Sequence, residues 1–182
     1  MSKYDHDFGW AQQYMPQVKA ILGPLLLSEA PIELDQSEAT DLMVLKARDM
    51  RVGVRIRRPS YNRRYQDQFT LRLSRPSGAR TEWEKVLYDG FGDWLFYARA
   101  AKGRLDPWMV VDLHALRGLF IRRHVTQWVN AGAVGKQHNG DGTSFVWVDA
   151  RKIEAAGHRL LVASSGLDIR APQQQERLRN AS

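Results

Sequence analysis

The sequence predicts an α/β domain whose core runs helix, three strands, helix, strand, with a mixed sheet. Two stretches, 51–58 and 68–74, alternate between apolar and polar residues, which is typical of half-buried strands. Thr81 stands three residues before Glu84, the spacing of a capping box that starts a helix. A length of 182 residues is enough for one domain with a sizeable core, which we expect over residues 1–171.

The first element is predicted to be a helix over Phe8–Leu27, because its apolar residues recur at helical spacing. Pro16 and the Gly23-Pro24 pair are expected to kink or end it. A polar connection then leads to the strands.

Two strands are predicted next, over Leu42–Lys46 and Arg51–Arg58, and a tight turn at 47–50 would join them as an antiparallel hairpin. In the second strand Val52, Val54 and Ile56 would lie on one face. The other face would then carry Arg51, Gly53, Arg55 and Arg57.

A basic loop at 59–67 leads to a third strand, Gln68–Ser74, which we expect to extend the hairpin into three antiparallel strands. A helix from Thr81 to about Tyr88 and a strand over Trp94–Arg99 follow. With a further strand at 108–112, the expected core spans about residues 8–112.

The C-terminal additions are expected over 113–171. They comprise a helix over Leu113–Trp128, a β-hairpin over 132–149 with an Asn-Gly tip, and a short helix at 152–156. The Gln- and Arg-rich tail, 172–182, is expected to be disordered.

Composition excludes several classes of protein. The chain has no cysteine, which rules out disulfides, thiolate catalysis and Cys-ligated zinc and favours a cytoplasmic location. Its apolar runs are too short to span a bilayer, so no membrane partner is expected. No phosphate-binding glycine loop and no Gly-x-Ser-x-Gly motif is present, so nucleotide-dependent and serine-hydrolase chemistry lack support.

Positive charge is concentrated in one part of the chain. Residues 1–40 carry two Lys/Arg and six Asp/Glu, a balance of −4, whereas 41–80 carry eleven and three, a balance of +8. Residues 81–182 carry fourteen and eleven, which brings the net charge to +7. Almost all cations of the central segment are arginine, which grips phosphate with two parallel hydrogen bonds. DNA is therefore the expected partner and RNA the second, unless the cations form a solvated sheet face.

The first two predicted strands carry a family resemblance. Thr40–Leu45 followed by Arg51–Arg58 resembles the PD-(D/E)XK nucleases, the restriction-endonuclease-like superfamily, in which an Asp begins one core strand and Glu-x-Lys lies on the next. Asp41 matches the Asp, and Arg55 and Arg57 fall where the Glu and the Lys would be. The resemblance implies an αβββαβ core and a DNA-facing surface.

The change to Arg-x-Arg puts cleavage in doubt. In the family the strand Asp and the Glu hold a divalent metal, and the Lys helps to position the attacking water. A guanidinium offers the metal no oxygen ligand, and a cation at Arg55 would repel it. Arg57 could still stabilise charge on the scissile phosphate, as the Lys would.

A rearranged metal site is one hypothesis. Asp41 would bind Mg²⁺ or Mn²⁺ together with Glu33, Asp35 or Glu38 from the preceding segment, and Asp41 and Arg57 would be the catalytic residues of a metal-dependent endonuclease. The alternative is that these acids only solubilise a loop and that Asp41 pairs with Arg55 across the hairpin.

A nucleic-acid grip without chemistry is the leading hypothesis. Arginines would contact phosphates, and tyrosines of the basic loop would stack on exposed bases. Arg55, Arg57 and Arg72 would share one sheet face. The residues expected at this surface are Arg55, Arg57, Arg58, Arg63, Arg64, Arg72, Arg75, Tyr61 and Tyr65.

The alternative function is a non-enzymatic protein-interaction module, such as an accessory or inhibitor protein of a phage or mobile element, docking an acidic partner. Six tryptophans and many arginines suit such a surface, although most tryptophans are expected in the core. His114, two residues after Asp112, could be catalytic, but a histidine at a helix start is more often structural. The sequence leaves the oligomeric state open.

Overall fold

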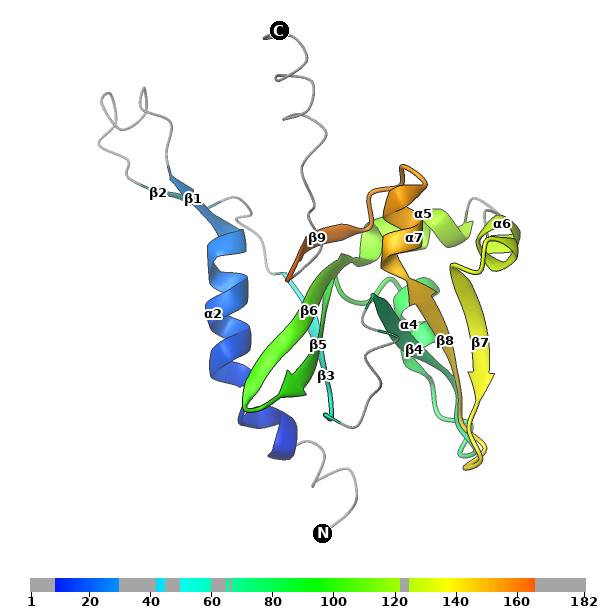
Figure 1. Ribbon diagram of the computed structural model, residues 1–182. Helices are drawn as coiled ribbons and strands as arrows, with labels where there is room; N and C mark the ends of the chain where they lie inside the picture. The colour runs from blue at the N-terminus through cyan, green and yellow to red at the C-terminus, as the bar shows by residue number, and fades with distance from the viewer. Residues whose placement is uncertain are drawn as a thin grey trace, which may run out of the picture.

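The computed structural model describes residues 9–29, 42–44, 50–59, 65, 67–121 and 125–165. Over these residues the chain is mixed α/β, with sheets of two, four and three strands (Figure 1). The tail predicted over 172–182 lies outside the described residues. No helix in the described part of the chain is long and apolar enough to cross a membrane.

The N-terminal helix forms where the apolar stripe predicts it. A short helical turn ends near Gln12, and α2 runs over Met15–Leu26 with Pro16 in its first turn, where a missing amide proton costs nothing. Pro24 lies within the last turn of α2, so it accompanies the end of the helix and does not break its middle.

The predicted hairpin between 42–46 and 51–58 is wrong. β2, Leu42–Val44, pairs antiparallel with β1, Leu27–Glu29, a strand that the sequence did not indicate. β3, Val52–Arg57, instead pairs in parallel with β5, Trp94–Ala101, in the four-stranded sheet. The alternating pattern specified strands correctly but carried no information about which edge each would meet.

The four-stranded sheet has the order β3-β5-β6-β9 and is mixed. β6, Arg104–Asp112, and β9, Leu161–Ser164, extend it by antiparallel pairing beyond β5. β6 is longer than predicted, and β9 was not predicted. Because β3 and β5 are parallel, the chain must cross over between them, and this crossover contains β4 and the helix α4.

The strand predicted over 68–74 forms with those bounds as β4, Gln68–Ser74, but it does not join β3 in three antiparallel strands as expected. It pairs with β8, Ser144–Asp149, in a sheet of order β4-β8-β7. The reason is burial: Phe69 and Leu71 stand opposite Val148 and Val146 in the register, and all four side chains are buried.

The hairpin predicted over 132–149 is confirmed as β7, Val134–His138, and β8, which meet in antiparallel register around the predicted tip. The helix expected over 113–128 is found as two helices, α5, Leu113–Ile121, and α6, Val125–Asn130. The last helix, α7, spans Ala150–Ala155 and begins at the end of β8.

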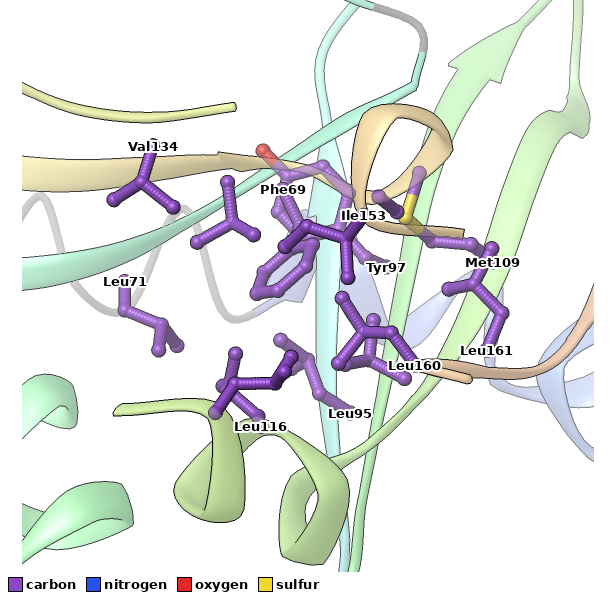
Figure 2. Close-up of a cluster of buried hydrophobic side chains, with 14 of the residues drawn as sticks. Phe69, Leu71, Leu95, Tyr97, Met109, Leu116, Val134, Ile153, Leu160 and Leu161 are labelled. Carbon is purple, nitrogen blue, oxygen red and sulfur yellow. The ribbon is translucent and has the colours of Figure 1, made fainter. Parts of the chain in front are cut away.

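Two apolar clusters hold these layers together. One lies on the face of the four-stranded sheet that carries Leu95 and Tyr97 and combines it with β4, β7, β8, α5 and α7 (Figure 2). The other lies on the opposite face, where Trp94 and Phe96 pack with residues of α2 such as Val18. The four-stranded sheet is therefore covered on both faces, and β3 forms its edge.

The helix α4, Glu82–Leu87, begins with the predicted capping box. The Glu84 amide donates to Thr81 Oγ1 at 3.3 Å, and Glu84 Oε2 accepts from the Thr81 amide at 2.7 Å. The hydrogen bond from the Thr81 backbone, followed by that from its side chain, lowers the pKa of Glu84 below its usual 4.5.

Ionised Glu84 should stabilise the fold, so the free energy of unfolding should fall as the solution is acidified. Because its pKa is lower in the folded chain, the carboxylate stabilises the fold above the unfolded value of 4.5, and this contribution is lost as pH falls through the lower folded value. Chemical denaturation at pH 7 and at decreasing pH should show this loss in the wild type and a smaller one in Glu84→Gln. Equal acid-side slopes in the two proteins would contradict it.

Candidate nucleic-acid interface

The predicted site centres on the place where the two larger sheets meet. β3 is the edge strand of the four-stranded sheet, and β4 is the edge strand of the three-stranded sheet. Side chains of β3 reach the backbone and the side chains of β4, so they bridge the two edges. We call this place the arginine junction; its residues are Arg55, Arg57, Arg99, Thr70, Tyr97 and Glu82.

Arg55 links three elements. Its Nη1 donates to the carbonyl oxygen of Thr70 at 3.2 Å, and its Nη2 forms an ion pair with Glu82 Oε1 at the start of α4. The other oxygen of Glu82 accepts the amide of Arg72 at 3.1 Å. Arg55 and Glu82 together therefore satisfy a carbonyl and an amide on the edge of β4 that faces away from β8.

Arg57 lies on the same face of β3 as Arg55. Its Nε donates to the Tyr97 hydroxyl at 2.6 Å, its Nη2 donates to Thr70 Oγ1, and its guanidinium lies 5.5 Å from the Tyr97 ring centroid. Thr70 and Tyr97 are both buried. These contacts hold the guanidinium in a fixed position between the sheets.

Arg99 is the member of the junction that the sequence did not single out. It is the register partner of Arg57 on the neighbouring strand, it is only 7% exposed, and its Nη2 donates to the carbonyl oxygen of Tyr65. The sequence could have indicated Arg99, because it lies two residues after Tyr97 and both side chains therefore point to one face of β5. Thr70, Tyr97 and Glu82 were also missed, because they come from other elements.

The prediction that Arg55, Arg57 and Arg72 share one sheet face is wrong. Arg72 belongs to β4 and therefore to the other sheet. Arg55 and Arg57 do lie on one face of β3, as alternation predicts, but they are half-buried and face the junction between the sheets.

The other predicted contact residues differ in how exposed their side chains are. The guanidinium of Arg58 lies 4.8 Å from the ring centroid of Trp10, and both residues are half-buried. Arg75 and Tyr65 are exposed. Several predicted ligands and contacts lie outside the described residues: Glu33, Asp35, Glu38, Asp41, Tyr61, Arg63 and Arg64.

The described part of the chain contains no group of three His, Asp or Glu side chains that could hold a metal ion. β3 offers a metal no ligand, because its side chains are apolar or guanidinium groups and that of Arg55 is paired with Glu82. The residues described around the junction therefore do not fit a divalent ion.

His114 has a different partner from the one its spacing suggested. Its Nε2 lies 3.5 Å from Asp93 Oδ1, while Asp93 Oδ2 accepts the amide of Arg51 at 2.9 Å. Asp112 instead accepts the amides of His114 and Ala115, at 2.8 and 3.0 Å, and so caps the start of α5. Asp112 has a structural role, and the His114 side chain is exposed.

Comparison with models of known protein families, with curated proteins and with solved structures gives no match for this chain.

The side chains of Arg55 and Glu82 should show a measurable coupling energy in the free energy of unfolding. Its side chains are 18% and 37% exposed, and removing either leaves groups at the β4 edge without this partner, so each of Arg55→Ala and Glu82→Ala should cost about 1–3 kcal/mol in the free energy of unfolding. A double-mutant cycle measured by urea unfolding should give a coupling energy above about 0.5 kcal/mol.

A matched control is the Arg80–Asp89 pair, in which Arg80 is 60% exposed and the closest distance is 2.6 Å. Its coupling energy should stay below about 1 kcal/mol and below that of Arg55 with Glu82, because solvent screens it. Equal coupling in the two pairs would show that Arg55 does not bridge the sheets as described.

Proposed function

We propose that this chain is a nucleic-acid-binding protein whose contact surface is built around the arginine junction. The observation that carries the proposal is the charge of residues 41–80, a balance of +8 from eleven Lys/Arg and three Asp/Glu in a chain of net charge +7. β3 and β4, the two sheet edges that meet at the junction, both come from this segment. A polyanion is the ligand that such a concentration of arginine favours.

The arginines of the junction supply a fixed field, and neighbouring ones supply contacts. The guanidinium groups of Arg55, Arg57 and Arg99 are held in place by hydrogen bonds. Arg75 is exposed immediately after β4 and can reach phosphate oxygens directly. Guanidinium groups held in fixed positions beside an exposed arginine favour phosphate binding over non-specific association with other ligands.

A nuclease-like scaffold is the finer part of this proposal. The parallel pairing of β3 with β5, across a crossover that contains α4, supports an αβββαβ core of the restriction-endonuclease type. β1 and β2 form a sheet of their own and β4 pairs with β8, so the described residues do not include the three consecutive antiparallel strands of that core. The family's catalytic face would then coincide with the face of β3 that carries Arg55 and Arg57.

Binding should depend steeply on salt and on the central arginines. The variant Arg58→Ala/Arg63→Ala/Arg64→Ala/Arg75→Ala should bind a fluorescent oligonucleotide more weakly and with a flatter slope of log K against log salt, by about 0.7–0.9 for each phosphate that is no longer neutralised. Fluorescence anisotropy between 50 and 300 mM salt, roughly the range over which such slopes are resolved, measures both quantities.

The matched control removes four exposed cations from other parts of the chain, as Lys19→Ala/Lys102→Ala/Arg104→Ala/Arg159→Ala. Its net charge is the same as that of the first variant, so its affinity and slope should stay closer to those of the wild type. If both variants lose affinity equally, the surface is wrongly placed, and if the wild type binds no nucleic acid, the proposed function is wrong.

Cleavage is a separate proposal that depends on Asp41 as metal ligand with Glu33, Asp35 or Glu38, and on Arg57 facing the phosphate. Supercoiled plasmid, single-stranded DNA and branched DNA should each be incubated with Mg²⁺ or Mn²⁺ and with the wild type or Asp41→Asn. Cutting by the wild type that disappears in Asp41→Asn is the expected result for an endonuclease. If the wild type cuts none of these substrates, the protein binds nucleic acid without cleaving it.

A protein-interaction module remains the second candidate, since Phe91 and Val129 are 48% and 51% exposed although both are large apolar side chains. Phe91 lies beside Arg51, whose guanidinium is 5.6 Å from its ring centroid, a combination found at interface hot spots. Failure to bind any polynucleotide would favour this function.

A further inference from the structure

The three-stranded sheet has one face that takes no part in the apolar clusters. Alternation along β8 buries Ser144, Val146 and Val148 and leaves Phe145 and Trp147 half-buried on the other side. Neither aromatic residue belongs to the two clusters of buried side chains in the described part of the chain. We call this side the outer face.

Strand register defines the neighbours of the two rings. Phe145 stands between Arg72 of β4 and Gln137 of β7, and Trp147 stands between Thr70 and Gly135. Residues directly opposite each other on neighbouring strands point to the same face. The outer face therefore carries two successive rows, one of Arg72, Phe145 and Gln137 and one of Thr70, Trp147 and Gly135. Thr70 is buried against the arginine junction.

The position of the Trp147 ring depends on Gly135. A Cβ at Gly135 would lie 2.8 Å from Nε1 of Trp147 and closer still to two carbons of the indole, so any larger residue would displace the ring. The missing side chain lets the indole lie over β7. The ring thus has a defined position on the sheet and is still partly exposed.

We propose that the outer face stacks unpaired bases of single-stranded nucleic acid on Phe145 and Trp147. This inference rests on the proposed function and deepens it, because it specifies an unpaired strand as the ligand. Aromatic side chains on a sheet stack bases of any sequence, and Arg72 and Gln137 beside them can contact phosphates and base edges.

The spacing of the rings favours a single strand over a duplex. Two residues apart in an antiparallel strand, the rings stand about 7 Å apart along β8. This is roughly twice the 3.4 Å between stacked nucleotides of one strand in B-DNA. Two consecutive bases can meet the two rings only when they have left the helical stack.

The charged groups near the outer face also favour single-stranded nucleic acid as the ligand. Thr70 joins the outer face to the arginine junction, because its hydroxyl accepts from Arg57 and its carbonyl from Arg55. Asp149 follows Trp147 on the same side of β8 and is the N-cap of α7. Its carboxylate accepts a hydrogen bond from the Lys152 amide at 3.1 Å. A phosphate backbone beside the stacked bases would therefore run toward the guanidinium groups.

The test compares affinities for single-stranded oligo(dT), single-stranded oligo(U) and a DNA duplex. Phe145→Leu/Trp147→Leu keeps an apolar side chain at both positions but removes both rings, and it should weaken single-strand binding about fivefold to a hundredfold for each base unstacked. Duplex affinity should change less than threefold. The ring-retaining variant Phe145→Tyr/Trp147→Phe should restore most of the single-strand affinity, and the two single-stranded ligands distinguish DNA from RNA.

Tyr88→Leu is the control for losing an exposed aromatic residue elsewhere, since Tyr88 is 74% exposed at the C-terminal end of α4, and it should leave all three affinities unchanged. Single-strand affinity in Phe145→Leu/Trp147→Leu equal to that of the wild type would overturn the inference and leave the proposed function standing. A wild type that binds no polynucleotide would overturn both.

A second measurement covers the case in which the leucine variant does not fold. Wild-type protein is photo-crosslinked to a single-stranded oligonucleotide containing 5-iodouracil, and the attached peptide is identified by mass spectrometry. Attachment to the peptide containing Phe145 and Trp147 is expected, because the reactive base must lie against an aromatic ring. Attachment only to other peptides would overturn the inference.

Discussion

The contact on which the rest of the structure depends is the bridge from Arg55 to Thr70 and Glu82. It brings together the edges of two separate sheets, and each edge would otherwise present backbone groups that need partners. The Thr70 carbonyl is satisfied by Arg55 and the Arg72 amide by Glu82, so the edge of β4 opposite β8 is closed by side chains. The apolar cluster between the sheets then packs behind this bridge.

The same bridge gives a physical reason for arginine at a position where the resemblance would place a metal-binding Glu. A carboxylate at position 55 could neither donate to Thr70 nor pair with Glu82, so it would leave the β4 edge open. Arginine secures the joint between the sheets, where its guanidinium bonds Thr70 and pairs with Glu82. A metal ion would need ligands from elsewhere in the chain.

Sequence periodicity predicted the strands better than their partners. The bounds of β4 agree with the prediction, and those of β3 and β5 differ from it by one or two residues, because a period of two is a local property. Pairing is not local. β4 meets β8, more than seventy residues later, because Phe69 and Leu71 find Val148 and Val146 there. β3 joins β5 in parallel, which no alternation could distinguish from an antiparallel hairpin.

The sequence by itself determined where positive charge gathers and that Arg55 and Arg57 point to one side of their strand, since both follow from composition and from the geometry of an extended chain. Only the tertiary structure decided what those arginines contact. Thr70, Glu82 and Tyr97 come from three other elements, between 13 and 40 residues further along the chain. The period of a strand sets the direction of a side chain, whereas its partners depend on how whole sheets and helices pack.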